Sequence, residues 1–320
     1  MKAVAYDRYG TPDVLEFRDV PEPVPADDEV LVRVHATSVN FADWLFLRGS
    51  PRVLRLGAGL RRPKAPVLGT DLAGRVEAVG AAVTGLRPGD EVFGSGRGAF
   101  AELAVAKATH LVAKPAGLSF EQAAAVPMAG LTALHGLRAA DVRAGQRVLV
   151  NGAAGGVGTF AVRLAKARGC RVTGVCSAGG GELVRSIGAD HVIDYGARDF
   201  TREGARYDVI LDNVGNHALS DLRRALTPKG TLVLNSGRGG RWLGSAPRIV
   251  RALATSLFTG QRLKVFFSAV NAADLAELAA LVESGRVVPV VGRTLPLARA
   301  ADAFAYFGEG HARGKVVVTV

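Results

Sequence analysis

The chain has 320 residues, 48% of them apolar, and its 40 Lys and Arg exceed its 29 Asp and Glu to give a formal charge of +11. This length and composition predict a globular protein of two domains and exclude an intrinsically disordered chain. No apolar run reaches the roughly 18 residues that a membrane span needs, so we expect no membrane partner and a cytoplasmic location. The two cysteines, Cys170 and Cys176, are too few for a disulfide framework or a structural zinc site.

The positive charge is locally concentrated in residues 48–64. A basic face favours an anionic partner, which leaves three candidates: a nucleic acid, an acidic carrier protein or a phosphorylated cofactor. The arginines are scattered over most of the chain and lack the interleaved aromatic residues of a base-stacking surface. We therefore do not expect a nucleic acid partner.

The first 115 or so residues read as strands separated by Gly and Pro, with examples at 29–39, 72–80 and 90–95. This pattern predicts an antiparallel β domain. A helix is then expected over 119–137, because Ser119 is a good N-cap and Gln122 stands where a capping box needs it.

From residue 147 to about 237, short apolar strands alternate with helices. Strands are expected at QRVLVNG, CRVTGVC, DHVID, YDVILDNVG and GTLVLNSG, with an amphipathic helix over 158–168 after the first of them. This alternation predicts a parallel sheet with right-handed crossovers. The segment 241–261 is expected to be helical, 263–270 a sixth strand and 272–283 a helix.

The last strand, 315–320, is expected to return to the first domain. The predicted fold class is therefore α/β: a doubly wound parallel sheet plus an antiparallel β domain formed by both chain ends. The predicted domains are 1–118 with 271–320, and 119–270.

The stretch GAAGGVG, residues 152–158, lies between an apolar strand and the amphipathic helix. Gly155 lets backbone N–H groups approach a pyrophosphate, and Gly158 lets the helix pack closely on the strand. The first glycine of the dinucleotide fingerprint would fall at Ala153. Because strand, turn, helix and second strand occur at the expected spacing, we predict a dinucleotide site rather than a merely tight turn.

The end of the second strand indicates which dinucleotide is bound. An acidic side chain there would hydrogen-bond the ribose hydroxyls of NAD, but the chain has Cys176 and Ser177. Without that carboxylate nothing repels a 2′-phosphate, so NADP(H) is favoured. Tyr195, after the third strand, adds a candidate hydroxyl donor.

The chain resembles the zinc-independent medium-chain dehydrogenases/reductases of the quinone oxidoreductase group. The resemblance runs over the whole chain and rests on seven motifs in order: ATSVNFADW (36–44), PVLGTDLAGRVEAVG (66–80), PMAGLTAL (127–134), NGAAGGVG (151–158), GADHVIDY (188–195), DNVG (212–215) and HARGKVVV (311–318).

The resemblance implies a GroES-like β domain flanking a Rossmann domain, with the nicotinamide in the cleft between them. Relatives commonly carry Arg or Lys two residues past Ser177, where this chain has Gly179, which weakens the expected NADPH preference unless Arg185 reaches across. Carried over residue by residue, the cofactor contacts are Asn40 and Thr132 (nicotinamide), Ala154, Gly155, Gly156 and Val157 (pyrophosphate), Ser177 and Tyr195 (adenosine phosphate), and Ser236, Gly237, Phe267 and Lys315 (remaining face).

Zinc-dependent relatives hold a catalytic ion with Cys and His. The matching positions here are Ser38-Val39-Asn40 and Thr70-Asp71, so we expect no metal. Quinones and α,β-unsaturated carbonyls accept hydride without a Lewis acid, and the protein then contributes orientation and a hydrogen bond to the developing oxyanion. Asn40 is the candidate donor, with Asp43 nearby, and water is the expected proton source.

Two alternatives remain open at this point. One is an enoyl-thioester reductase acting on a carrier-bound substrate, with the 48–64 cluster docking an acidic partner. The other is a non-catalytic nucleic-acid-binding or structural protein, for which the charge is the only support. By resemblance we also expect a homodimer formed through the strand near 263–267.

Overall fold

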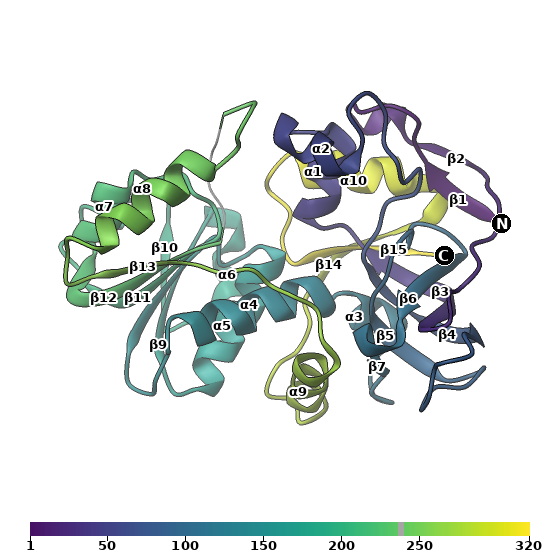
Figure 1. Ribbon diagram of the computed structural model, residues 1–320. Helices are drawn as coiled ribbons and strands as arrows, with labels where there is room; N and C mark the ends of the chain where they lie inside the picture. Colours follow the sequence, from purple (N-terminus) through teal and green to yellow (C-terminus); the bar gives the residue numbers. More distant parts are fainter. Residues whose placement is uncertain (236–239) are drawn as a thin grey trace. The chain divides into compact units, whose positions relative to one another are not determined.

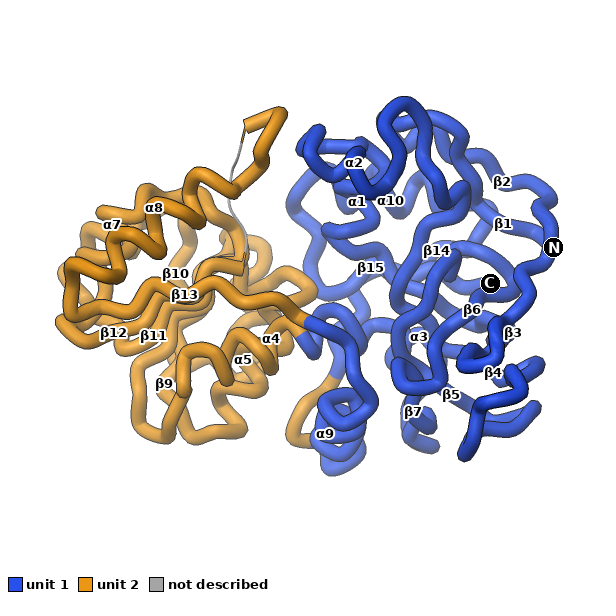
Figure 2. The backbone as a smooth tube through the Cα atoms, viewed as in Figure 1, with its two compact units in different colours: residues 1–131, 269–285, 289–320 blue, residues 132–268, 286–288 orange. Residues whose placement is uncertain are grey.

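The computed structural model describes residues 1–235 and 240–320. These form two compact units, residues 1–131, 269–285 and 289–320 (unit 1) and residues 132–268 and 286–288 (unit 2), coloured separately in Figure 2. The contacts thus group residues 119–131 with unit 1, whereas the sequence analysis places them in the second domain. The exact domain limits stay a prediction.

Unit 1 is built on a seven-stranded sheet in the order β14-β15-β3-β4-β5-β7, with β6 also paired to β3. The C-terminal strand β15 lies antiparallel to β3, so both chain ends contribute to one sheet. A two-stranded sheet, β1-β2, accompanies it. The strands are β1 (Lys2–Ala5), β2 (Glu16–Asp19), β3 (Glu29–Ser38), β4 (Asp71–Val79), β5 (Glu91–Ser95), β6 (Leu103–Lys107), β7 (Leu111–Ala113), β14 (Val291–Pro296) and β15 (Lys315–Thr319).

One core of unit 1 packs α10 against the strands through Phe304, whose ring centroid lies 5.1 Å from that of Phe100. The helices of this unit are α1 (Phe41–Arg48), α2 (Arg55–Ala58), α3 (Phe120–Ala124), α9 (Ala272–Glu283) and α10 (Ala300–Gly308). Short 3-10 turns occur in both units at η1 (Pro12–Val14), η2 (Arg52–Leu54), η3 (Ala108–His110), η4 (Ala178–Gly180) and η5 (Leu297–Arg299).

The helix expected over 119–137 is two helices. The predicted capping box is present, since Ser119 Oγ accepts from Gln122 N at 3.2 Å and Gln122 Oε1 accepts from Ser119 N at 3.1 Å. However, α3 ends at Ala124 and α4 (Pro127–Ala139) begins at Pro127. Proline has no N–H to continue the first helix and suits the first position of a new one, which explains the break.

Unit 2 contains a six-stranded, fully parallel sheet in the order β10-β9-β8-β11-β12-β13. Figure 1 shows α7 and α8 on one face of this sheet and α5 on the other. The elements are β8 (Arg147–Asn151), α5 (Gly156–Ala167), β9 (Arg171–Cys176), α6 (Gly181–Ser186), β10 (His191–Asp194), β11 (Tyr207–Asp212), α7 (Leu219–Arg224), β12 (Leu226–Leu234), α8 (Ala246–Ser256) and β13 (Arg262–Val265).

The order of strands in unit 2 reverses between β8 and β11. From β8 the chain moves outward to β9 and β10, and it then returns to the other side of β8 for β11, β12 and β13. In such sheets ligands bind beyond the carboxyl ends of the strands at the reversal point. The expected fold class, a doubly wound parallel sheet with an antiparallel β domain from both chain ends, is confirmed.

Candidate active site and cofactor site

The glycine-rich turn follows β8 at the reversal point of the unit 2 sheet. Gly152 has a φ of 82°, which favours glycine, and Gly155 N donates to Gly152 O at 3.2 Å to close the turn. Gly155 is then the N-cap of α5, whose first amides have no acceptor within the helix and carry its positive dipole end. This arrangement suits a pyrophosphate.

The remaining positions of the turn are closely packed. Ala153 replaces a fingerprint glycine, and a Cβ at the facing Gly174 of β9 would lie only 2.9 Å from its methyl group. Gly174 therefore leaves the space that Ala153 occupies. A Cβ at Gly158 would lie 2.0 Å from the carbonyl oxygen of Gly152, so α5 and the turn are in direct backbone contact there.

Gly158→Ala is expected to weaken both stability and dinucleotide binding. The added methyl group must push α5 away from the turn, which costs about 1–3 kcal/mol in the free energy of unfolding and displaces the first amides of the helix. Guanidinium unfolding and fluorescence titration with NADPH measure the two effects. Gly57→Ala, in helix α2 where a Cβ would meet no atom within 4 Å, is the control for replacing a helical glycine. Equal effects of the two substitutions would contradict the packing argument.

Two of the predicted adenosine-phosphate residues lie beside each other. Ser177 follows β9, Tyr195 follows β10, and Tyr195 N donates to Cys176 O at 3.1 Å. The phenol ring of Tyr195 is half exposed. The guanidinium of Arg185 folds back over the start of α6, since a Cβ at Gly181 would lie 3.5 Å from Arg185 Nη1. Arg185 is eight residues after Ser177, but its guanidinium lies close to Gly181, so a cation is near this segment even though position 179 is glycine.

A buried polar network at the ends of β8 and β11 was not foreseen from the sequence. Asn151 Nδ2 donates to Asp212 Oδ1 at 2.9 Å, and Arg248 Nη2 donates to Asp212 Oδ2 at 3.0 Å. Next to it, the buried Nδ2 of Asn213 has no hydrogen-bond partner among the residues that the structure describes. A buried donor without a partner at this edge fits a ligand rich in acceptor oxygens, as a dinucleotide is.

The remaining cofactor residues expected in unit 2 are dispersed. Thr132 is buried in α4, whereas Phe267 is almost fully exposed just after β13. Ser236 and Gly237 lie outside the described residues. These assignments stay predictions.

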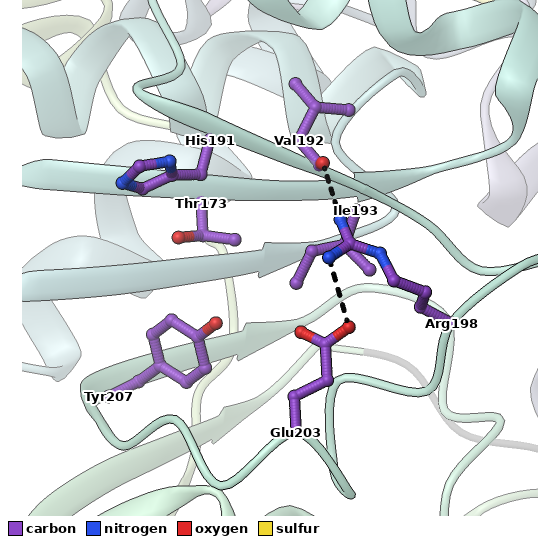
Figure 3. Close-up of a pocket in the computed structure, with 7 residues that line it drawn as sticks. All are labelled: Thr173, His191, Val192, Ile193, Arg198, Glu203 and Tyr207. Carbon is purple, nitrogen blue, oxygen red and sulfur yellow. Dashed lines mark hydrogen bonds and ion pairs between the residues drawn. The ribbon is translucent and has the colours of Figure 1, made fainter.

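Unit 2 also has a cavity of about 220 Å³. Figure 3 shows the side chains that line it. His191 and Tyr207, which line it, are the first residues of β10 and β11, and its ion pair joins Arg198 Nη1 to Glu203 Oε1 at 3.4 Å. The cavity is therefore at the amino ends of these strands, away from the glycine-rich turn.

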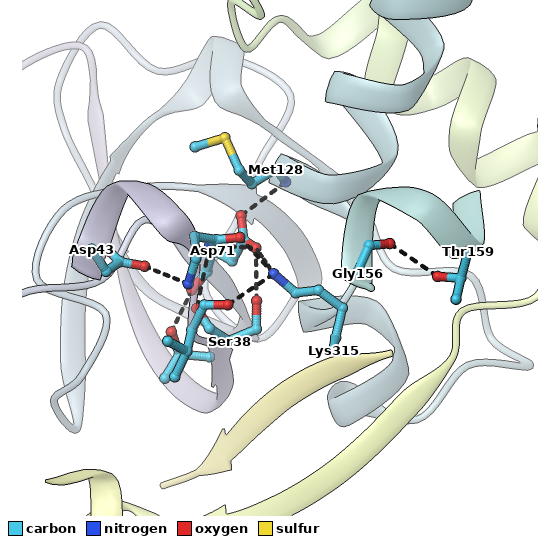
Figure 4. Close-up of polar contacts among 10 residues, drawn as sticks. Ser38, Asp43, Asp71, Met128, Gly156, Thr159 and Lys315 are labelled. Atoms are coloured by element: carbon cyan, nitrogen blue, oxygen red, sulfur yellow. Dashed lines mark hydrogen bonds and ion pairs between the residues drawn. The ribbon is translucent and has the colours of Figure 1, made fainter. Parts of the chain in front are cut away.

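In unit 1, the sheet brings together three polar residues that are far apart in the sequence. β3 runs antiparallel to both β4 and β15, so its end at Ser38 pairs with Asp71 at the start of β4 and with Val317 in the middle of β15. Asn40 follows β3, and Lys315 opens β15. Figure 4 shows Asp71, Lys315 and Ser38 of the resulting buried cluster. Asn40 completes it through its hydrogen bond with Lys315.

Every polar atom of this cluster has a defined partner. Lys315 Nζ donates to Asn40 Oδ1 at 2.5 Å, to Asp71 Oδ2 at 3.3 Å and to the carbonyl of Val39 at 3.3 Å. Asn40 Nδ2 donates to Asp71 Oδ2 at 2.9 Å and to the carbonyl of Ser38 at 3.3 Å. Asn40, Asp71 and Lys315 are 5%, 0% and 3% exposed, so the amide of Asn40 is held in one orientation between a cation and an anion.

Two further donors bind Asp71. Ser38 Oγ donates to Oδ2 at 2.7 Å and the backbone N of Met128 donates to Oδ1 at 2.9 Å. A fully buried carboxylate needs such partners because its desolvation is otherwise prohibitive. Asp71 is the centre of the cluster, and the sequence analysis did not assign it a role.

Asp43 lies in the first turn of α1, next to this cluster. Its Oδ2 accepts from Asn40 N at 2.9 Å. Burial, and then repulsion from the Asp71 carboxylate, raise the pKa of Asp43 to about 7. Asp43 can therefore hold a proton near neutral pH, as few carboxyl groups do.

The sequence analysis identified Asn40, Asp43 and Lys315 but not the contacts between them. It assigned Lys315 to the cofactor face, and the structure engages all three of its ammonium protons within unit 1. The sequence did contain one indication that Asp71 and Lys315 form an ion pair. Each begins an apolar strand, and a buried charge requires a partner of opposite sign.

Comparison with known proteins agrees with this architecture. A model described as the alcohol dehydrogenase GroES-like domain matches residues 26–116, and one described as a zinc-binding dehydrogenase matches residues 187–318. The chain is 33% identical over 334 residues to a chloroplast envelope quinone oxidoreductase homolog of Arabidopsis thaliana, covering 99% of this chain and 98% of that protein.

Two further proteins extend the comparison. A 2-methylene-furan-3-one reductase of Solanum lycopersicum is 34% identical, covering 99% of this chain and 79% of that protein. The crystal structure of the Escherichia coli quinone oxidoreductase complexed with NADPH superposes with a TM-score of 0.86 at 26% identity, covering 100% of both chains. With its fold, its glycine-rich turn and these relatives, the chain belongs to the quinone oxidoreductase group of the medium-chain dehydrogenase/reductase superfamily.

Proposed function

We propose that the protein is an oxidoreductase that transfers hydride from NADPH to a quinone or an α,β-unsaturated carbonyl without a metal ion. The observation that carries the proposal is the glycine-rich turn at the sheet reversal, combined with Ser177 in place of an acid at the end of β9. Relatives named as quinone oxidoreductases, a furanone reductase and an NADPH complex support the acceptor class and the cofactor.

The residues of unit 2 fit NADPH. The amides at the start of α5, from Ala154 to Val157, would hold the pyrophosphate, and Ser177, Tyr195 and Arg185 would face the 2′-phosphate. Bound NADPH would supply the hydride. The Nδ2 of Asn213, which has no partner within residues 1–235 and 240–320, offers a further donor at the same edge.

The residues do not fit a catalytic zinc ion, although one matching family model is named for zinc binding. Zinc in such enzymes needs three Cys, His or acidic ligands together, and both cysteines of this chain lie on β9 or just before it. Within residues 1–235 and 240–320, no three such side chains are placed to hold an ion. Asp71, the buried carboxylate, already has the ammonium of Lys315 as its counter-charge. From the side chains available at this site, we propose that the reaction does not use a metal ion.

Asn40 is the proposed donor to the oxyanion that hydride addition creates. Its Nδ2 makes its longer hydrogen bond, 3.3 Å, to the carbonyl of Ser38, and this is the bond that a substrate oxygen would replace. Lys315 on Oδ1 draws electron density from the amide and makes Nδ2 a stronger donor. The proton then comes from water, as expected from the sequence.

Ser177→Asp is expected to reverse the cofactor preference. A carboxylate there repels the 2′-phosphate and accepts the ribose hydroxyls of NADH, so the ratio of kcat/KM for NADPH over NADH should fall by at least about tenfold. Ser186→Asp, which adds the same charge at the exposed end of α6, is the control. Equal shifts in the two variants would show that only the general charge matters, against a 2′-phosphate site at Ser177.

The activity is tested with a panel of quinones, small enones and enoyl thioesters, each with NADPH and NADH. Oxidation of NADPH by quinones or enones supports the proposal. Turnover of thioesters alone would favour the enoyl-thioester alternative, and no oxidation with any acceptor would overturn both. The nucleic-acid-binding alternative has no support in the comparisons.

Homodimer formation and a cytoplasmic location are also proposals. β13 is the terminal strand of the unit 2 sheet, and Phe267 just beyond it is 93% exposed, as expected for an edge that pairs with a second copy. A monomeric mass in light scattering would contradict the dimer. No helix in the described part of the chain has the length and apolar character to cross a membrane.

A further inference from the structure

The helix α8 of unit 2 has its apolar side turned to the solvent. Val250 and Leu253 on this side are exposed, and the chain continues after the helix with Leu257 and Phe258, which are 81% and 86% exposed. Trp242 and Leu243, just before the helix, are also exposed. We call these six residues the α8 ridge; Figure 1 shows the helix at the surface of its sheet.

Two polar side chains of α8, those of Arg248 and Ser256, point to the protein instead. Arg248 donates to Asp212 in the network described above, and Ser256 Oγ accepts from Leu263 N of β13 at 3.1 Å. Ala252 is the buried residue that packs on the sheet. The amphipathic pattern is therefore the reverse of that of a helix covering its own core, and six exposed apolar side chains in and beside one helix are typical of a docking surface.

The charge around the α8 ridge indicates what docks there. Between Asp221 and Asp274 the sequence has no acidic residue and nine Lys or Arg. Within the described span of α8, Arg251 is the one charged residue that is exposed. A cavity of about 420 Å³ next to Phe258 is lined by Arg223, Arg224 and residues 259–261. Arg224 is ion-paired with Asp221 at 2.8 Å, whereas Arg241 and Arg251 are exposed along the α8 ridge. This basic, apolar surface complements an anionic, apolar one.

We propose that the α8 ridge docks the protein on the surface of an anionic lipid bilayer. The helix lies in the plane of the interface, its apolar side chains reach the acyl boundary, and the arginines contact the phosphate headgroups. The sequence has no apolar run long enough to span a membrane, but a helix that lies in the plane of the interface does not need such a run. A symmetric contact between two α8 ridges fits less well, because it would bring the exposed Arg241 and Arg251 of both copies together. The proposal does not depend on the reaction catalysed.

Flotation with vesicles tests the proposal on the full chain. We expect binding to phosphatidylcholine vesicles that contain phosphatidylglycerol, weaker binding to phosphatidylcholine alone, and a decrease with salt. The double variant Leu257→Ser, Phe258→Ser should bind at least about tenfold more weakly, and Arg251→Gln should lower the salt dependence. Val24→Ser removes a side chain of matched exposure, 84%, from unit 1 and should bind as the wild type does.

The fluorescence of Trp242 gives a second readout. In a Trp44→Phe background it is the one tryptophan left, and its emission should shift to shorter wavelength on anionic vesicles. The proposal is overturned if the wild type stays unbound with anionic vesicles at low salt, or if the double variant binds equally well. It is also overturned if the double variant converts a dimer to a monomer in light scattering while vesicles are not bound, because the α8 ridge would then belong to a second copy.

Discussion

Lys315→Met is expected to lower the free energy of unfolding by about 3–5 kcal/mol, because it leaves the carboxylate of Asp71 buried without its counter-charge. Asp71 is fully buried, and its Oδ2 lies 3.3 Å from Lys315 Nζ. The same change frees the Oδ1 of Asn40 from its 2.5 Å contact, so the amide loses its fixed orientation. We therefore expect kcat to fall along with stability. Guanidinium unfolding measures the first effect and steady-state kinetics the second.

Two comparison variants distinguish the loss of the buried counter-charge of Asp71 from a general loss of positive charge. Lys2→Met breaks an exposed ion pair with Asp19, whose side chains are 48% and 74% exposed, and should cost less than about 1 kcal/mol. Asp71→Asn combined with Lys315→Met removes both buried charges and should recover much of the stability lost in the single variant. If the effects of the two substitutions simply add, Lys315 and Asp71 do not interact and the cluster is misassigned.

Asp43 is expected to make the protein less stable as the pH rises from about 4 to about 7. The pKa of Asp43 in the folded chain is about 7, because of burial and then the Asp71 carboxylate, against about 4 in an unfolded chain. Between these values the folded chain keeps a proton on Asp43 that the unfolded chain has released. The free energy of unfolding therefore falls as the pH rises, by up to about 4 kcal/mol once the pH exceeds the folded pKa.

Asp43→Asn tests this expectation. The amide keeps an oxygen for the 2.9 Å hydrogen bond from Asn40 N but cannot ionise. The difference in unfolding free energy between Asp43→Asn and the wild type should grow in favour of the variant across that pH range. A constant difference from about pH 4 to pH 8 would mean that Asp43 titrates as an ordinary carboxyl group.

Features set by neighbouring residues were predictable from the sequence. The capping box of Ser119 and Gln122 is present, and the glycine-rich turn leads from β8 into α5 where the spacing predicted. Both depend on backbone conformations and hydrogen bonds within a few residues. The break at Pro127 was equally local, and the expected single helix was wrong there because the helix that starts at the capping box was continued through a proline.

The candidate site in unit 1 was only partly predictable. Asn40 and Asp43 lie three residues apart and share one helix turn, so their proximity follows from the sequence. Lys315 is 275 residues from Asn40 and 244 from Asp71. Its place depends on the register of β3 with β4 and β15, and a single sequence does not show register between distant strands.

By itself the sequence determined the fold class, the dinucleotide turn and the absence of an acid after β9, because each rests on local spacing and residue type. The tertiary structure alone decided that Lys315 and Asp71 neutralise each other around Asn40, and that the apolar side of α8 faces outward. The periodicity of a helix shows that it has two different sides, but only packing against the sheet settles which side is buried.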